Sequence, residues 1–101
     1  MESAGNPLYS CSNCRNPLAL VEDLISKNFL ATSGKAYMFQ HVMNVALGPK
    51  YDAQMLTGRH SIADIFCNKC GEKLGWKYVQ AYDQENRYKE GNFILEELKM
   101  F

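Results

Sequence analysis

The sequence predicts a mainly β domain in which antiparallel strands predominate and helix is confined to one or two short segments. Stretches rich in aromatic and β-branched residues follow one another from residue 35 onwards, as they do in buried strands. Clusters of Gly, Pro and Asp separate some of these stretches. Two C-x2-C pairs, far apart in the chain, predict one metal site that fastens distant parts of this small domain together.

Length and composition fit one globular domain. The chain has 101 residues, of which 47% are hydrophobic and 22% charged, so disorder over its whole length is excluded. Lys and Arg number 11 and Asp and Glu number 11, whereas proteins that grip phosphate backbones usually carry a basic excess. No signal-peptide pattern is visible, and the longest uncharged run, residues 36–49, is too short and too polar to span a membrane. We therefore expect a soluble intracellular domain.

The first part of the chain is expected to contain a leader and one helix. Residues 1–8 have little to bury and predict a flexible leader, which leaves residues 9–101 as the domain. In residues 16–27 apolar side chains recur at helical spacing after Pro17, which favours a short helix.

The remainder is expected to be β. Residues 35–47 and 60–66 are rich in aromatic and β-branched side chains and predict strands, the second of which runs directly into Cys67. Residues 47–54 contain Gly, Pro and Asp and predict a loop.

Three segments complete the chain. Residues 75–82 predict a strand with Trp76 and Tyr78 on one face. Residues 83–91 predict a charged turn or one short helix whose side chains are solvated or contact a partner. Residues 92–101 predict a closing strand, because a compact sheet needs a last partner.

Four cysteines predict one structural zinc site: Cys11, Cys14, Cys67 and Cys70. In each C-x2-C motif a tight turn directs two sulfurs towards one ion, and four thiolates close the tetrahedral shell of zinc. Gly71 directly follows the second pair, where the turn can require a positive φ. Backbone N–H groups, helped by Arg15 and Lys69, are expected to offset the negative charge of the four thiolates.

Three alternatives exist for the cysteines. Disulfides are disfavoured in a reducing compartment, redox C-x2-C motifs occur singly near a βαβ pattern, and the spacings match no common iron–sulfur run. A closed shell of four thiolates leaves no coordination position for water and no free thiol, which argues against hydrolysis and thiol chemistry. We therefore expect one structural Zn²⁺ and no enzymatic activity.

Several motifs resemble the Yippee family. They are the C-x2-C-x52-C-x2-C spacing and the segments LISKNF, GKAYMF, MLTGRHSIADIFC, LGWKY and RYKEG, and the similarity covers nearly the whole chain. The resemblance implies a zinc-binding β domain whose two antiparallel sheets are pinned at one edge by zinc, called a β-tent. Similar architecture is known in the thalidomide-binding domain of cereblon, Mis18 centromere proteins, innate RNA sensors and methionine-R-sulfoxide reductases, so the fold alone does not settle function.

The resemblance also implies protein partners. Some Yippee-like proteins belong to a multisubunit ubiquitin ligase, and others are linked to the nucleus, the centrosome and cell division. We expect a non-catalytic adaptor of the nucleus and cytoplasm that binds a protein within a ubiquitin-ligase or cell-cycle assembly and that does not contact membranes.

Aromatic residues near the second cysteine pair are candidates for a ligand pocket. By analogy with the cereblon-like domain, Trp76 and His60 fall at wall positions, and Tyr78 shares the strand face of Trp76. Phe39 is expected to approach from another strand. Such walls suit a small molecule or modified peptide that presents a flat apolar or cationic group. The competing interpretation places these side chains in the core, and His41 is expected to be structural.

Two other functions occur on similar folds. Binding of RNA or DNA needs a basic cluster, whereas Lys and Arg are scattered here among acids. A methionine sulfoxide reductase needs a thiolate outside the metal shell, and all four cysteines are taken as ligands. Nucleic-acid binding is thus the alternative to an adaptor, and reductase activity is disfavoured.

Overall fold

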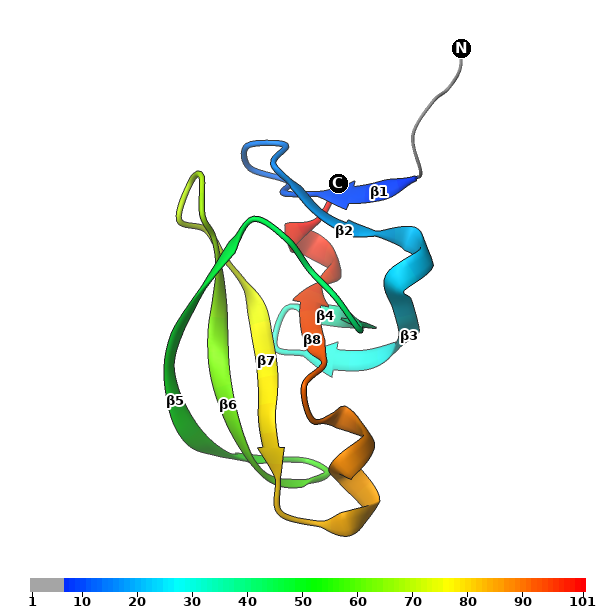
Figure 1. The fold of residues 1–101 in the computed structure, drawn as a ribbon, viewed down its shortest axis with the longest axis vertical. Coiled ribbons are helices and arrows are strands. Elements are labelled where there is room, and N and C mark those ends of the chain that lie inside the picture. The colour runs from blue at the N-terminus through cyan, green and yellow to red at the C-terminus, as the bar shows by residue number, and fades with distance from the viewer. Residues whose placement is uncertain (1–6) are drawn as a thin grey trace.

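The computed structural model describes residues 7–101, which form two antiparallel sheets (Figure 1). The smaller sheet pairs β1 (Leu8–Ser10) with β2 (Pro17–Leu20). The larger sheet has six strands, in the spatial order β3 (Leu24–Ala31), β4 (Gly34–Phe39), β8 (Phe93–Glu96), β7 (Lys73–Ala81), β6 (Gly58–Cys67) and β5 (Val45–Met55). The prediction of a mainly β fold with two antiparallel sheets is confirmed.

Helix is confined to three short 3-10 turns among the residues described: η1 (Val21–Asp23), η2 (Gln84–Lys89) and η3 (Glu97–Lys99). None of them is long enough to cross a bilayer. Of the leader expected over residues 1–8, residues 1–6 lie outside the described part, and Leu8 is the first residue of β1.

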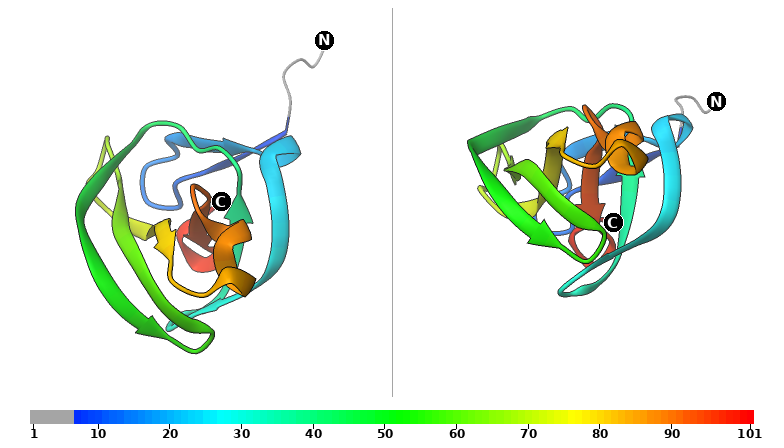
Figure 2. Two further views of the ribbon diagram at one scale, coloured as in Figure 1. Left: turned by 60° about the horizontal axis from the view of Figure 1, so that its bottom comes forward. Right: turned by 90° about the horizontal axis from the view of Figure 1, so that it is seen from below.

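The six-stranded sheet does not close on itself. Its order leaves β3 and β5 as edge strands, each with one unpaired side. The sheet curls strongly, so that the ribbon in Figure 2 forms an incomplete ring with β5 on one side and β3 on the other. An opening between the two edges is the result.

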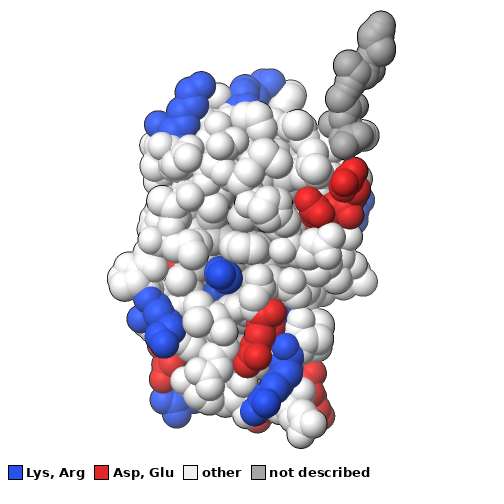
Figure 3. All heavy atoms as spheres, in the orientation of Figure 1, with Lys and Arg blue, Asp and Glu red and all other residues white. Residues whose placement is uncertain are grey.

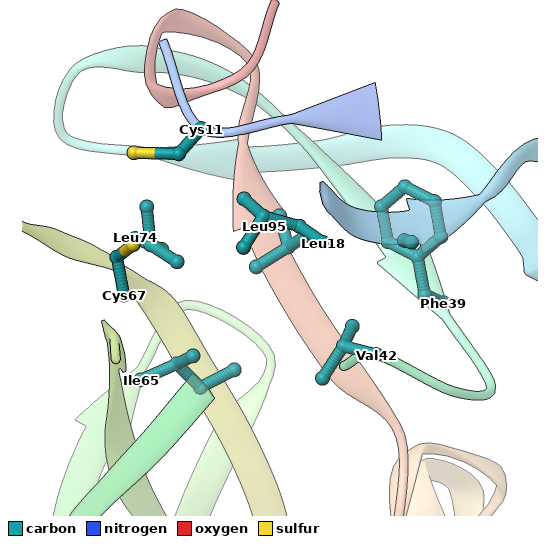
Figure 4. Packing of buried hydrophobic residues seen from close by; sticks show 9 residues of the cluster. Cys11, Leu18, Phe39, Val42, Ile65, Cys67, Leu74 and Leu95 are labelled. Atoms are coloured by element: carbon teal, nitrogen blue, oxygen red, sulfur yellow. The ribbon is translucent and has the colours of Figure 1, made fainter. Parts of the chain in front are cut away.

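The central strands of this sheet send alternate side chains into two separate cores. Met38 of β4 pairs with Ile94 of β8, and Ile94 pairs with Trp76 of β7, so these three residues share one face. The neighbouring Phe39 and Leu95 point to the opposite face. The core on their face lies at the cysteine end of the molecule (Figure 4) and includes Leu18, Phe39, Ile65, Leu74 and Leu95.

The prediction of a helix over residues 16–27 is wrong. The chain there forms β2, the single turn η1 and the start of β3. Ala19 pairs with Tyr9 in the small sheet, and Leu24 pairs with Phe39 in the large one. A continuous helix would remove the strand partner of β1 and one of the two partners of β4. Pairing with distant segments therefore overrides a local helical pattern that β-branched residues already weaken.

The loop expected over residues 47–54 is also wrong, because β5 runs through it without ending. Pro49 lacks an N–H group, but an edge strand has one side on which no hydrogen bond is needed. The pairing with β6 is irregular between Leu47 and Lys50, which is where Gly48 and Pro49 lie. The sequence signal therefore marked a bulge rather than a loop.

Other segments agree with the sequence to different degrees. β6, β7 and η2 confirm the strands expected at 60–66 and 75–82 and the short helix expected within 83–91. The strand expected over 35–47 is divided, since β4 ends at Phe39 and β5 begins at Val45. The closing strand β8 ends at Glu96, and η3 follows.

Candidate functional site

The four cysteines meet although more than fifty residues separate the two pairs. Their Sγ atoms all lie within 4.8 Å of one another. Cys11 and Cys70 are 3.7 Å apart at sulfur, and Cys14 and Cys67 are 3.6 Å apart. These separations are much longer than a disulfide bond of about 2.05 Å. They match the edge of about 3.8 Å expected for four thiolates around a tetrahedral ion with metal–sulfur bonds of about 2.3 Å.

The two cysteine turns share one hydrogen-bond pattern. In the first turn Arg15 N–H donates to Cys11 O and Cys11 N–H donates to Asn16 O, both over 2.8 Å. In the second, Gly71 N–H donates to Cys67 O over 2.9 Å and Cys67 N–H donates to Glu72 O over 2.8 Å. The two turns therefore present their sulfur pairs in the same way.

The residue after each second cysteine has a left-handed backbone. Gly71 has φ 81°, which agrees with the expectation from the sequence. Arg15 occupies the corresponding place in the first turn with φ 66°, an uncommon value for a residue with a side chain. Its guanidinium lies 3.5 Å from the centre of the Phe101 ring, so a cation–π contact helps to hold this conformation.

Hydrogen-bond donors surround the sulfur atoms. Asn16 donates from Nδ2 to Cys67 Sγ over 3.4 Å and to Asn68 Oδ1 over 3.0 Å. Burial raises the pKa of the Cys67 thiol, but the backbone N–H groups of Cys70 and Lys69 and the Asn16 amide outweigh it and lower this pKa to about 6. Lys69 thus contributes through its backbone. Donors of this kind favour the thiolate, the form that binds a metal.

The remaining thiols differ in environment. The Asn13 side chain, followed by the backbone N–H of Glu72, lowers the pKa of Cys70. Burial raises the pKa of Cys14 to about 12. Because like charges at this distance oppose one another, four adjacent thiols ionise together only when a cation lies among them. The donor set fits a soft divalent metal ion.

The last residues of the chain tie the first turn to the second. The backbones of Cys11 and Met100 form an isolated antiparallel β-bridge. Ser10 and Phe101 exchange two backbone hydrogen bonds of 3.2 and 2.7 Å. Lys99 donates to Glu72 over 2.6 Å. The C-terminal segment therefore lies between the two cysteine turns and holds them together.

Replacing Asn16 by alanine is expected to weaken metal binding about 10–100-fold. Loss of a side chain that hydrogen-bonds to a metal ligand has an effect of this size in other metal sites. The substitution removes the amide that supports the Cys67 thiolate. Competition with a chromophoric chelator measures the change. Asn28→Ala, on an exposed position of β3, is the matched control and should leave affinity unaltered. Equal affinities in both variants would contradict a role for Asn16.

A second feature is a hollow of about 980 Å³ on the face of the large sheet that carries Trp76. Both edge strands contribute to it, through Ser26 and residues 28–31 of β3 and residues 54–55 of β5. Its other walls come from β7 and η2. The hollow therefore occupies the opening that the unclosed sheet leaves.

Aromatic rings form much of its wall. Trp76 and Tyr78 contact each other edge to face, with ring centres 6.2 Å apart, and Phe29 lies 6.5 Å from Tyr78. The Trp76 indole N–H is buried without a hydrogen bond of normal geometry among the described residues. Burial raises the pKa of Tyr78, and the nearby Trp76 N–H offsets part of that shift.

Two of the expected pocket residues lie elsewhere. His60 is fully buried behind Tyr78, 5.0 Å away between ring centres, and its Nδ1 lies 3.0 Å from Gly58 O. Phe39 is fully buried on the opposite face of the sheet, where it packs against Tyr9. The alternation of β4 causes this, because Met38 rather than Phe39 shares a face with Trp76.

The sequence interpretation missed Lys89 as a residue of this hollow. The segment around it was expected to be solvated, yet Lys89 is only 3% exposed, and Asn86 only 9%. Asn86 donates to Thr57 O over 2.8 Å, which fixes η2 against the β5–β6 turn. No local pattern in a charged segment indicates that one lysine turns inward.

Together, the sheets and the four clustered thiols define a β domain of the metal-binding class that is stapled by cysteines from two distant turns. A model of the Yippee–Mis18 family, described as Yippee zinc-binding/DNA-binding and Mis18 centromere assembly, matches residues 8–101. The chain belongs to this family.

Relatives and solved structures agree. A yippee-like protein of Arabidopsis thaliana is 57% identical over 93% of this chain and 90% of its own length. Yippee-like 3 of Danio rerio is 51% identical and that of Homo sapiens 50%, each over 87% of this chain and 74% of the relative. The crystal structure of a Mis18 'Yippee-like' domain superimposes with a TM-score of 0.74 at 11% identity, over 93% of this chain and 91% of that one. The last similarity shows the shared fold.

Proposed function

We propose that the four cysteines hold one structural Zn²⁺ and that the domain is a non-catalytic recognition module. The sulfur separations support a tetrahedral four-thiolate shell, and the family description names zinc binding. When bound, the ion would neutralise and cross-link the thiolates. With all four thiols engaged, the chain offers no cysteine nucleophile or reducing thiol.

The observation that carries the recognition role is the aromatic hollow around Trp76 and Tyr78. A hollow of several hundred cubic ångströms with apolar walls and few polar groups is typical of sites for small ligands or peptide side chains. Exposed apolar side chains stand at its rim, including Leu30 (71% exposed) and Leu56 (98% exposed). Such a rim suits contact with a protein.

The metal site gives the hollow a fixed wall. β7 leaves the second cysteine turn at Lys73 and reaches Trp76 three residues later, where Trp76 pairs with Asp64 of β6 and Ile94 of β8. β7 therefore has a paired strand on each side, and the second cysteine turn holds its first residues in place. Preorganisation of this kind lowers the entropic cost of binding.

The proposed ligand is a segment of a protein or a small molecule, and the proposed setting is a ubiquitin-ligase or cell-cycle assembly in the nucleus and cytoplasm. Binding of nucleic acid is the second candidate, because the matching family description includes DNA binding. Basic and acidic side chains are scattered over the face in Figure 3 without one basic patch, and this favours a protein. Affinity for an oligonucleotide that falls steeply with salt would instead support the second candidate.

Replacing Trp76 by alanine is expected to reduce recovery of bound partner at least about tenfold, because a buried aromatic anchor typically contributes 2 kcal/mol or more to binding. Affinity purification with wild type and variant measures it, and metal content should stay near one ion per chain. Tyr82→Ala, an exposed aromatic residue outside the hollow, is the control. Undiminished recovery would contradict the proposal, and unfolding of the variant would identify Trp76 as a core residue.

A further inference from the structure

Lys89 is a buried cation at the inner wall of the hollow. Its ammonium lies 5.4 Å from the centre of the Tyr78 ring, 5.6 Å from Phe29 and 5.9 Å from Tyr88. Its hydrogen-bond acceptor among the described residues is Thr57 Oγ1, at 2.8 Å. An ammonium has three N–H donors, so this contact leaves further donors for another acceptor.

The charge of Lys89 is not matched by the protein. Residues 7–101 place no carboxylate within 4.0 Å of its ammonium, and none of the residues that line the hollow is acidic. The three rings stabilise the cation only in part, and burial lowers the pKa of Lys89. A buried charge normally has an oppositely charged partner, and Lys89 has none among residues 7–101, so an anion in the hollow would complete an ion pair.

The walls around Lys89 are aromatic. Trp76 contacts Tyr78 edge to face and lines the same hollow. The Trp76 indole N–H is itself buried, so Lys89 is the donor that carries the inference. An ammonium can only donate, and it therefore calls for an anionic acceptor, while the aromatic walls call for an apolar frame.

We propose that Lys89 makes this hollow select a carboxylate carried on a flat apolar frame, such as the C-terminal carboxylate of a peptide with an apolar last residue or a small aromatic acid. The inference rests on the recognition role proposed above and specifies its ligand. The cationic groups that aromatic walls alone would suit are disfavoured, because Lys89 repels them. A planar monoanion matches the single charge of one ammonium, whereas a phosphate would require more donors.

Three matched probes test this preference on the metal-loaded full chain: 3-phenylpropanoate, 3-phenylpropanamide and 3-phenylpropylammonium. Trp76 is the only tryptophan and lines the hollow, so its fluorescence reports binding, and ligand-detected NMR checks it. The carboxylate is expected to bind about tenfold more tightly than the amide, as charge-assisted hydrogen bonds do, and the ammonium most weakly. Acetylated Gly-Gly-Phe with a free C-terminus, compared with its C-terminal amide, distinguishes a peptide end from a free acid.

Variants then assign the preference to one side chain. Lys89→Met keeps the length and should reduce the carboxylate-to-amide affinity ratio to about one, whereas Lys89→Arg should keep it above one. Lys50→Met, an exposed lysine outside the hollow, is the control and should not change it. An unchanged ratio in Lys89→Met overturns the inference.

Wild type decides the question even if a variant fails to fold. Equal affinity for carboxylate and amide overturns the role of Lys89 but leaves an aromatic recognition site standing, provided that Trp76→Ala weakens both. If none of the probes binds, the inference and the proposed hollow fail together.

Discussion

Replacing Cys67 by serine is expected to leave the chain unfolded and without bound metal. Cys67 is 2% exposed, supplies one of the four thiolates, and packs in the core at the cysteine end. Binding of zinc in small metal-folded peptides is worth about 10–16 kcal/mol, and a domain of this size is stable by about 5–15 kcal/mol. Because the two ranges are comparable, a chain that no longer retains the ion loses most or all of its stability. Circular dichroism and metal content of the purified chain measure the result.

The nearby substitution Lys69→Ser is the matched control, since it alters an exposed side chain of the same turn and keeps the backbone N–H that supports Cys67. It should keep the metal and most of the stability. Removing the metal from wild type with a chelator at raised temperature should also destabilise the fold, which is measured as a lower melting temperature. A Cys67→Ser chain that stays folded, metal-free and equally stable would show that the site is not structural.

Replacing Gly75 by alanine is expected to destabilise the fold by about 3 kcal/mol, at the upper end of the cost of overpacking. A Cβ at this position would overlap the Ile94 carbonyl oxygen and lie 2.8 Å from its carbon. β7 lies between β8 and β6 and cannot move away from one without losing the other. A shift of roughly 12–24 °C in melting temperature follows for a domain of this length.

Gly48→Ala provides the comparison for this prediction. Gly48 also has no left-handed backbone requirement, and its added Cβ would meet the flexible Phe66 ring at 3.3 Å on the edge strand β5. That ring can rotate, so the cost should be small. Equal destabilisation by the two substitutions would mean that loss of glycine, rather than backbone contact with β8, is responsible.

Features that depend on local chemistry were predictable. The C-x2-C pairs predicted that the four cysteines meet, because the spacing brings two sulfurs to one side of a turn, and their sulfurs do cluster. Gly71 was expected to need positive φ, and it does. The strands that became β6 and β7 have the aromatic and β-branched composition of buried strands. In each case the information lies within a few residues.

Features that depend on distant partners were not predictable in this way. The apolar spacing in 16–27 fits a helix locally, but β1 and β4 require strands as partners there. Pro49 interrupts a strand in most settings and is tolerated in β5 because that strand is an edge. Which strand becomes an edge is a property of the whole sheet.

The candidate recognition site shows the same division. The sequence alone determined the four candidate metal ligands, the mainly β class and the presence of an aromatic strand around Trp76, because these follow from residue type and short spacing. Only the tertiary structure decided which side chains share the hollow. Strand alternation assigns Phe39 to the other face, and the packing of η2 turns Lys89 inward. Strand register and helix docking arise from contacts between segments far apart in the chain, and no local pattern encodes them.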